Sequence, residues 1–462
     1  MEQTMAKKNK YEIDMCNGTI MDKLISFSLP LMLSGILQLM FNAVDIIVVG
    51  RFSGSQALAA VGSTSALINV FTNLFIGISL GANVLTARFY AAGREKEVSE
   101  TVHTAITLAL VSGIVMALVG LVFSKGALAL MGTPDDVIGL SALYMRIYFL
   151  GMPFFMLYNY GAAILRAVGD TKRPLLFLMI AGVINACLNM VLVIVFKLGV
   201  AGVAIATVIS QMISCVLVLR CLCRSESSYR LRFSELGMKG YYLKQIFSVG
   251  VPAGIQSTVI NFSNVLLQSS VNSFGSTAMA GYTAANNLLG FLYVSVNSIT
   301  QACMSFTSQN YGVGKLKRMD RVLADCMILS VVVAVVLGCI CYGFGPEILQ
   351  IYTEDAEVIA CGMEILAYTT ITYFLCGWMD LFPGALRGMG YSAVPMVLSV
   401  IGTVGTRVVW IFGIFPYHRS LAILFISYPA SWIITIILQV VCFYFVRRRV
   451  HRRSQTPAGQ EG

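Results

Sequence analysis

Residues 24–50 read LISFSLPLMLSGILQLMFNAVDIIVVG, and this stretch decides the fold class. It is 27 residues long and almost wholly apolar, which is enough to cross a bilayer with some tilt. Gln38, Asn42 and Asp45 lie inside it at positions i, i+4 and i+7, so they share one face of a helix. A carboxylate inside a membrane span costs a few kcal/mol on insertion scales. We therefore expect Asp45 to mark a cation or proton site in a membrane protein.

The composition excludes a soluble globular protein. Hydrophobic residues make up 57% of the 462 residues and charged residues only 12%, whereas soluble domains carry about 25% charged residues. The net charge of +10 does not indicate a nucleic-acid partner, because the basic residues fall in short loops and in the tail, where they fix membrane topology. The lipid bilayer is therefore the expected surrounding of most of the chain.

Apolar runs of similar length recur along the whole sequence and predict an all-α membrane protein with twelve transmembrane helices. The predicted spans cover residues 24–49, 57–81, 100–123, 137–158, 174–196, 200–220, 243–268, 278–302, 323–344, 357–380, 394–415 and 421–446.

The basic residues predict the orientation of these spans. Of the 32 Lys and Arg residues, 26 fall on the side of the N-terminus, four on the opposite side and two inside spans. Because cytoplasmic loops are enriched in Lys and Arg, both termini are expected in the cytoplasm. The first span is too long for a cleaved signal, so we expect a multi-pass protein of the cell (plasma or inner) membrane.

The sequence also repeats itself after 221 residues. Leu165-Arg166-x-x-Gly169 followed by Pro174 aligns with Leu386-Arg387-x-x-Gly390 followed by Pro395. Two six-helix lobes follow, in parallel orientation, and such duplicated transporters place a substrate cavity between the repeats near the midplane. The alternative is a duplication with an architectural role only. The predicted segments are an N-terminal segment 1–22, a first lobe 23–220, a linker 221–242, a second lobe 243–446 and a basic tail 447–462.

Polar residues of the first lobe form the candidate coupling site. Asn69 and Asn73 are spaced i, i+4, as are Asn185 and Asn189, and both pairs could converge on Asp45. A carboxylate with amide and hydroxyl oxygens suits a hard cation such as Na⁺, and a lone buried Asp also suits a proton carrier. The alternative is that the Asp45 side chain extends to the interface or pairs with Arg51. The predicted coupling residues are Asp45, Asn42, Asn185, Asn189 and Gln38, with Asp45 as a Na⁺ ligand or proton acceptor.

The second lobe repeats the polar stripe without the acid, as Asn261, Asn264 and Gln268. Because buried ions of opposite sign usually pair, Glu364 is expected to pair with Arg407 or Arg146, either as a fixed salt bridge or as a gate. Asp380 is expected to pair with Arg387 near a helix end. The predicted substrate-cavity residues are Asn69, Asn73, Tyr148, Asn261, Asn264, Glu364 and Arg407.

No nucleotide-binding, metalloprotease or nucleophile motif occurs in the sequence, so we expect neither an enzyme nor a bound cofactor. Transport would then draw on a gradient of Na⁺ or H⁺.

Several motifs resemble the multidrug and toxic compound extrusion (MATE) transporters of the wider flippase superfamily. They are the stretch from Pro30 to Gly50, the residues Ala57 to Gly62 and the paired Leu-Arg loops, and the resemblance extends over nearly all of residues 20–446. It implies a V-shaped, twelve-helix monomer that exports small cationic, amphipathic compounds in exchange for Na⁺ or H⁺.

The resemblance also implies roles for single residues. Asp45 matches the coupling Asp of the family's first helix, and Asn185 matches the Asn beside it. One branch has an Asp where this chain has Asn189. Another branch uses a Glu in span 7, where this chain has Asn261, and an Asp in span 10 about one turn from Asp380.

Three functions remain open from the sequence. The first is an ion-coupled multidrug antiporter. The second is a lipid-linked oligosaccharide flippase, which would need more cationic side chains than Arg146 and Arg407 to hold pyrophosphate. The third is a membrane-embedded enzyme or a receptor that transports nothing.

Overall fold

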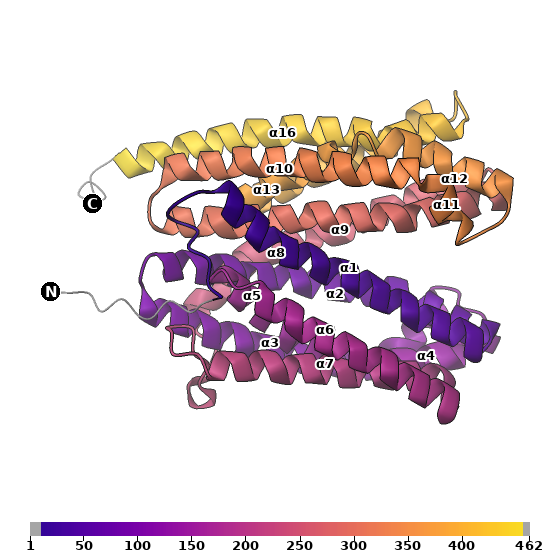
Figure 1. Cartoon of the computed structure of the whole chain (residues 1–462), viewed down its shortest axis with the longest axis horizontal. Coiled ribbons are helices and arrows are strands. Elements are labelled where there is room, and N and C mark those ends of the chain that lie inside the picture. Colours follow the sequence, from indigo (N-terminus) through magenta and orange to yellow (C-terminus); the bar gives the residue numbers. More distant parts are fainter. Residues whose placement is uncertain (1–10, 456–462) are drawn as a thin grey trace. The chain divides into compact units, whose positions relative to one another are not determined.

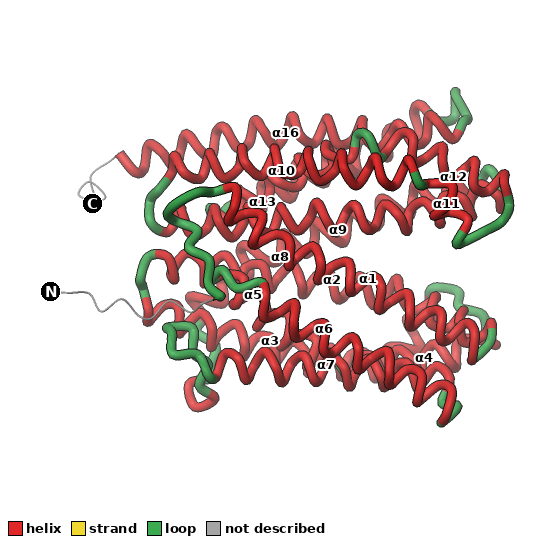
Figure 2. Tube along the Cα trace, in the orientation of Figure 1, coloured by secondary structure: helices red, strands yellow, loops and turns green. Residues whose placement is uncertain are grey.

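The computed structural model describes residues 11–455, and within that range the chain consists of helices and short loops without a strand (Figures 1 and 2). The helices are α1 (Met21–Phe52), α2 (Ser55–Ala91), α3 (Glu95–Leu130), α4 (Asp135–Leu150), α5 (Met152–Ala167), α6 (Lys172–Asn189), η1 (Met190–Val195), α7 (Gly199–Cys223), η2 (Phe233–Glu235), α8 (Gly240–Asn272), α9 (Ser276–Gly312), α10 (Leu316–Gly343), α11 (Gly345–Gln350), α12 (Ala356–Thr369), α13 (Tyr373–Gly388), α14 (Ala393–Ser399), η3 (Val400–Gly405), α15 (Thr406–Val409), η4 (Trp410–Ile414) and α16 (Leu421–Gln455).

Each of the twelve predicted spans corresponds to one helix or to a run of helices. Among the described residues, eight helices are long and apolar enough to cross a membrane, and two bent helix pairs bring that number to ten. The other two are α8 and α9, with 33 and 37 residues, which carry more polar side chains. The all-α, twelve-helix fold class predicted from the sequence is therefore confirmed.

Two predicted spans are broken rather than continuous. Span 137–158 is the pair α4 and α5, bent by 47°, and span 357–380 is the pair α12 and α13, bent by 51°. Pro153 stands at the start of α5, where its fixed φ and missing N–H are tolerated, and Gly151 lies between the two helices. The second break ends at Thr372, which lies 221 residues after Gly151. Both repeats therefore bend their fourth span at the same place.

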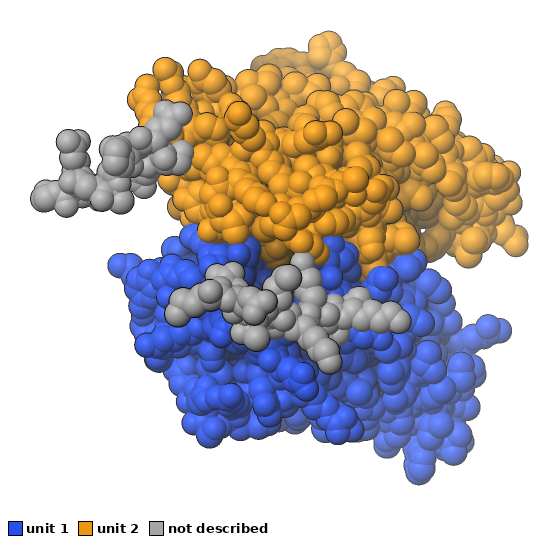
Figure 3. All heavy atoms as spheres, turned by 60° about the vertical axis from the view of Figure 1, so that its left-hand side comes forward, with its two compact units in different colours: residues 1–13, 33–254 blue, residues 14–32, 255–462 orange. Residues whose placement is uncertain are grey.

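The described chain forms two compact units (Figure 3). Of the described residues, unit 1 contains 11–13 and 33–254, and unit 2 contains 14–32 and 255–455. The boundaries inside α1 and α8 each come two residues after a proline, Pro30 and Pro252. The predicted lobes 23–220 and 243–446 follow the sequence repeat, whereas the compact units follow side-chain packing and exchange the first parts of α1 and α8.

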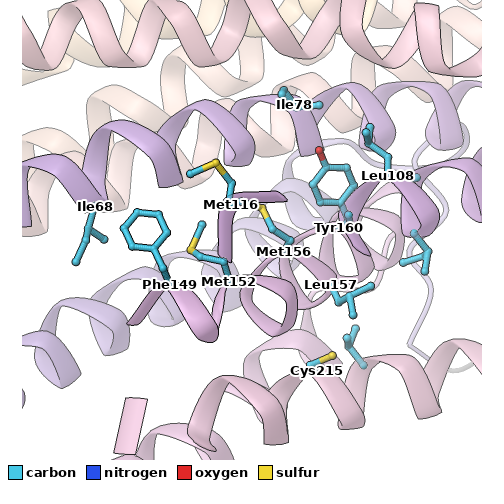
Figure 4. Close-up of a cluster of buried hydrophobic side chains, with 14 of the residues drawn as sticks. Ile68, Ile78, Leu108, Met116, Phe149, Met152, Met156, Leu157, Tyr160 and Cys215 are labelled. Atoms are coloured by element: carbon cyan, nitrogen blue, oxygen red, sulfur yellow. The ribbon is translucent and has the colours of Figure 1, made fainter. Parts of the chain in front are cut away.

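The core of unit 1 lies among α2, α3, α4, α5 and α7, which pack against one another. Phe149, Met152 and Met156 lie close together in it, and Tyr160 and Met116 extend the same apolar cluster (Figure 4). Methionine fills the irregular space at the α4–α5 bend because its side chain is unbranched and flexible.

Glycines allow α2 and the first part of α8 to cross closely inside unit 1. Gly77 of α2 faces Gly254 of α8, and a Cβ at Gly77 would overlap the backbone of Gly254. On the same crossing, Gly81 lies against the backbone of Ile246 and Gly250 against that of Ile78. Small residues four apart let membrane helices approach backbone to backbone. This crossing explains why the first part of α8 belongs to unit 1.

The core of unit 2 is rich in aromatic side chains. Trp432 of α16 lies edge-to-face with Tyr373 at a centroid distance of 5.6 Å and with Tyr428 at 5.9 Å. The Tyr282 and Tyr428 hydroxyls are 2.9 Å apart and buried, so each phenol satisfies the other. Aromatic packing and paired hydroxyls thus hold α9, α13 and α16 together.

The segment before α1 is attached by hydrogen bonds. The Glu12 carboxylate accepts from the hydroxyls of Tyr90 and Tyr229, each at 2.7 Å, within unit 1. Within unit 2, the Met15 carbonyl accepts from Asn310 Nδ2 at 3.1 Å and from Arg318 Nε at 3.2 Å. The described part of the predicted segment 1–22 is therefore ordered by specific partners.

Candidate functional site

Asp45 lies on the last third of α1, where a close approach brings α6 to it. A Cβ at Gly182 of α6 would overlap the ring of Phe41, which is one helical turn before Asp45. Only glycine leaves room for that ring at this position. Asn185 and Asn189 follow Gly182 on the same face of α6, so the contact at Gly182 brings both amides toward Asp45.

The Asp45 carboxylate is held by neutral groups from two helices. Asn189 Nδ2 donates to Asp45 Oδ1 and also to Asn185 Oδ1, the latter at 3.1 Å. Thr207 Oγ1 of α7 lies 3.5 Å from Asp45 Oδ2, at the limit of a hydrogen bond. Among the described residues, no basic side chain forms an ion pair with Asp45, so the alternative of pairing with Arg51 is not what the structure shows. A half-buried carboxylate with only neutral partners has no counter-charge among the described residues, so a cation or a proton could supply it.

Tyrosines of α4 complete the surroundings of the carboxylate. Tyr144 and Tyr148 stack at a centroid distance of 6.2 Å, and both lie close enough to Asp45 to interact electrostatically with it. Gln211 of α7 lies beside the Tyr148 hydroxyl. Asp45 is thus surrounded by phenol, amide and hydroxyl groups from α4, α6 and α7.

The backbone changes from α-helix to π-helix directly after Asn189, at η1. A π-helical turn is wider than an α-helical turn and is most often found at functional sites. The Asn189 side chain is buried, and its Oδ1 has no hydrogen-bond partner within the described residues. An unsatisfied buried oxygen beside a carboxylate is what an oxygen-coordinated cation requires.

The structure brings together some predicted coupling residues and separates others. Asn185 and Asn189 lie in the site with Asp45, whereas the side chains of Gln38 and Asn42 are exposed on α1. In the part of the chain that the structure describes, the hydrogen bonds of Asp45 come from α6 and α7 and not from its own helix. Gln38 and Asn42 have the helical spacing that places them on the face of Asp45, but a shared face does not by itself bring their side chains into contact with the carboxylate.

The polar pair of α2 is also separate from Asp45. Asn69 is exposed and Asn73 half-buried, and neither is hydrogen-bonded to Asp45 within the described residues. The Asp45 site instead contains three residues that were not predicted from the sequence: Thr207, Gln211 and Tyr144. Thr207 and Gln211 are spaced i, i+4 in a largely apolar helix, and that spacing was the available signal.

In unit 2, the expected ion pairs are wrong. Arg407 donates from Nη1 to Asn264 Oδ1 at 2.7 Å and to Ser263 Oγ at 3.2 Å. Neither Glu364 of α12 nor Arg146, which is exposed on α4, forms a salt bridge among residues 11–455. Neutral groups on α8 have taken the place of the expected carboxylate.

Asp380 likewise has no salt bridge with Arg387 in the described chain. Arg387 Nη2 donates to Gln256 Oε1 at 2.6 Å instead. The exposed Asn261 lies on α8 one turn before Asn264, without reaching Arg387. Within the described residues, no group of three or more His, Cys, Asp or Glu side chains could hold a metal ion together. Any cation at Asp45 would therefore be bound by one carboxylate and neutral oxygens.

A protein-family model described as MatE matches this chain twice, over residues 30–191 and again over residues 252–412. The chain belongs to the MatE family. The two matches start 222 residues apart, so they confirm the internal duplication and the family resemblance drawn from the sequence. Family membership also identifies a multidrug efflux transporter.

The MatE protein has relatives that extend over nearly its whole length. It is 32% identical over 434 residues to the probable multidrug resistance protein YoeA of Bacillus subtilis (strain 168), which covers 92% of this chain and 93% of the relative. It is 22% identical to the multidrug export protein MepA of Staphylococcus aureus (strain NCTC 8325 / PS 47), over 82% of this chain and 84% of the relative.

Solved structures support the fold of this MatE protein. An outward-facing multidrug resistance MATE family transporter of the MOP superfamily aligns with a TM-score of 0.87, covering 98% of this chain and all of that one (100%). The sequence identity is 19%, so this likeness establishes the architecture and not the substrate. Both MatE matches contain the polar residues described above, Asp45 and Asn189 in the first and Asn264 and Arg407 in the second.

Proposed function

We propose that this MatE protein exports cationic, amphipathic compounds in exchange for Na⁺ or H⁺ bound at Asp45. The observation that carries the proposal is the partner set of the Asp45 carboxylate, which consists of the Asn189 amide and the Thr207 hydroxyl. Ionisable residues inside transporter spans usually mark an ion pathway. Since no basic group neutralises Asp45 among the described residues, a transported cation would supply the missing charge.

The donor set suits either coupling ion. Na⁺ prefers oxygen ligands, and Asp45, Asn185, Asn189 and Thr207 supply carboxylate, amide and hydroxyl oxygens. Rotation of the Asn189 amide by half a turn would direct its unpartnered Oδ1 toward the carboxylate. A proton would instead convert Asp45 to a neutral carboxyl group, which the same neutral partners accept without a counter-ion. The coupling ion is thus cargo and not a resident cofactor.

Exchange follows if the ion and the drug each bind more tightly to a different conformational state, so that the two ligands compete. Binding of either ligand stabilises the state for which its affinity is higher, so opposite preferences couple the two fluxes. Pro30 lies in α1 three turns or more before Asp45, and a proline inside a helix removes a backbone hydrogen bond and permits bending. We infer that bending of α1 moves Asp45 relative to Asn189 and changes its affinity for the cation.

The proposal places both termini in the cytoplasm of a cell with a plasma or inner membrane, from the excess of Lys and Arg in the loops on that side. It also takes the single chain as the transporting unit, since the Asp45 site is built within one chain. Export then means movement of the drug away from the side of the termini.

The test uses purified full-length protein in liposomes with a Na⁺ gradient or a pH gradient imposed separately, and ethidium as the transported probe. Asp45→Asn keeps the hydrogen-bonding shape of the side chain and removes its charge. We expect it to abolish gradient-driven ethidium transport while thermal stability and incorporation stay unchanged. Whichever gradient drives the parent protein identifies the coupling ion.

Asp136→Asn is the matched control, because Asp136 is exposed in the first turn of α4, two turns before Tyr144. Full ethidium transport by Asp45→Asn, under the gradient that drives the parent protein, would refute the role of Asp45. Rescue of a lipid-linked-oligosaccharide flippase mutant, without dye transport under either gradient, would favour the flippase alternative.

A further inference from the structure

Arg407 is a buried cation without an acidic partner. Its side chain is 3% exposed, and it stands on α15, a single α-helical turn between the π-helical segments η3 and η4. π-Helical turns are frequent at functional sites, and here two of them flank the single turn that carries Arg407. A buried arginine normally has a carboxylate beside it, because an unpaired charge is expensive to bury.

The surroundings of Arg407 are polar but neutral. Nη1 donates to Ser263 and Asn264 of α8, and the guanidinium carbon lies 4.7 Å from the centre of the Tyr428 ring. The titratable groups that act on it are tyrosines and a cysteine, namely Tyr428, Cys376, Tyr282 and Tyr373. Its Nε is buried and has no hydrogen-bond partner within residues 11–455. The guanidinium therefore retains both its charge and a free donor.

The internal repeat relates this cluster to the Asp45 site. Thr207, which contacts Asp45, is equivalent to Tyr428 after the shift of 221 residues, and Tyr428 contacts Arg407. Asn264 is equivalent to Asn42 with one added residue. In each repeat the first, fifth and sixth spans supply the cluster, yet the charge is negative in the first and positive in the second. The charge therefore lies on the first span in one repeat and on the fifth span in the other, and the two clusters differ in sign.

We propose that the Arg407 cluster, defined as Arg407, Ser263, Asn264 and Tyr428, binds the carboxylate group of transported amphipathic compounds. A carboxylate can accept two parallel hydrogen bonds from one guanidinium, and such bonds to charged groups are the strong ones. The Nη1 group now held by Asn264 and the adjacent Nη2 group would be the two donors. This inference rests on the proposed transport function and adds a second substrate class to it.

Asn264 is the partner that an incoming carboxylate would replace. Its side chain is half-buried, and the exposed Asn261 and Gln268 lie on the same face of α8, one turn away on either side. These three residues form a polar stripe on α8 that ends at the guanidinium. The Asn264 amide oxygen satisfies Arg407 until a carboxylate displaces it. The aromatic rings of Tyr428 and Tyr282, near Arg407, provide the apolar contact that an amphipathic anion needs.

The first experiment measures equilibrium binding of fluorescein, an amphipathic carboxylate dye, to the purified full chain by fluorescence anisotropy. Loss of a hydrogen bond to a charged group corresponds to roughly a 10- to 100-fold loss of affinity. We expect Arg407→Gln to weaken fluorescein binding by about that factor and to leave thermal stability unchanged. Arg407→Lys, which keeps the charge but not the second parallel donor, should retain part of the affinity. Benzoate should displace the dye, and neutral benzamide should not.

Arg419→Gln is the control, because Arg419 is exposed in the loop before α16. Unchanged fluorescein binding by Arg407→Gln would overturn the proposal. An equal loss of fluorescein binding in Arg419→Gln would overturn it as well, because the effect would then follow from net charge and not from the Arg407 cluster.

A second variant tests the site even if Arg407→Gln fails to fold. Asn264→Asp places a carboxylate where the amide oxygen already accepts from Arg407, so it pairs the guanidinium and preserves the fold. We expect fluorescein affinity to fall by at least about tenfold, because the anion site is then filled from within. Unaltered fluorescein affinity in Asn264→Asp would contradict the proposal. The binding assay needs no ion gradient, so its result can be interpreted even if the proposed transport function is wrong.

Discussion

The glycine crossing between α2 and α8 makes a prediction about stability that the structure allows to be worked through. Gly77→Ala places a methyl group against the Cα and N of Gly254 and 3.1 Å from the carbonyl carbon of Ala253. Backbone atoms have no rotamer that could move aside, so the two helices must separate. Overpacking of this kind costs about 1–3 kcal/mol, and the upper half of that range applies when backbone meets methyl.

The same substitution also brings a gain. Replacing glycine by alanine inside a helix stabilises the helix by about 0.5–1 kcal/mol. The net destabilisation of Gly77→Ala is therefore about 2 kcal/mol, which lowers Tm by roughly 4–8 °C for a unit of this size. Because α8 carries Asn264 and Pro252, we also expect slower ethidium transport.

The control lies on the same helix. A Cβ at Gly62 of α2 would meet no atom within 4 Å, so Gly62→Ala should keep only the helix gain and raise Tm slightly. Unfolding is measured with a thiol-reactive fluorophore, since the free cysteines include buried ones such as Cys215 and Cys326. If Gly77→Ala were as stable as Gly62→Ala, the close crossing of the two backbones would be wrong.

Two further predictions concern individual hydrogen bonds. Asn189→Leu removes the amide that donates to Asp45, so we expect ion-driven ethidium transport to slow by at least about tenfold. Thr207→Val removes only a contact of 3.5 Å and should slow ethidium transport by less than about threefold. Equal effects of the two substitutions would contradict the assigned geometry. Glu12→Ala removes the acceptor that the part-buried hydroxyls of Tyr90 and Tyr229 share, so the free energy of unfolding should fall by about 1–3 kcal/mol. In a protein in which both tyrosines are already Phe, Glu12→Ala should lower the free energy of unfolding much less.

The sequence predicted the fold class well because its evidence was local. Apolar runs of membrane length showed where the twelve spans lie, and the 221-residue repeat showed that they form two halves. Asp45 was identifiable without a structure because a carboxylate in an apolar stretch is rare and costly. The bends within the fourth and tenth spans were missed, since hydropathy is the same on both sides of each bend.

Only the tertiary structure decided which side chains meet. Helical spacing put Gln38 and Asn42 on the face of Asp45, yet the hydrogen bonds come from Asn189 and Thr207 on other helices. Which faces of two helices meet depends on how closely the helices approach and how they are rotated. Here that is set by a single small residue, Gly182, whose missing side chain leaves room for the Phe41 ring.

The same dependence on how helices pack explains the partners of Arg407. From the sequence, an intramembrane arginine was expected to pair with an acidic residue such as Glu364. In the folded unit 2, α8 lies against the guanidinium and supplies Ser263 and Asn264, so the charge has no counter-charge among the described residues. The sequence thus determined the spans, the duplication and the presence of Asp45 and Arg407 within them. Tertiary packing alone decided that both charges are held by neutral partners, because contacts between helices distant in the chain leave no periodic pattern in it.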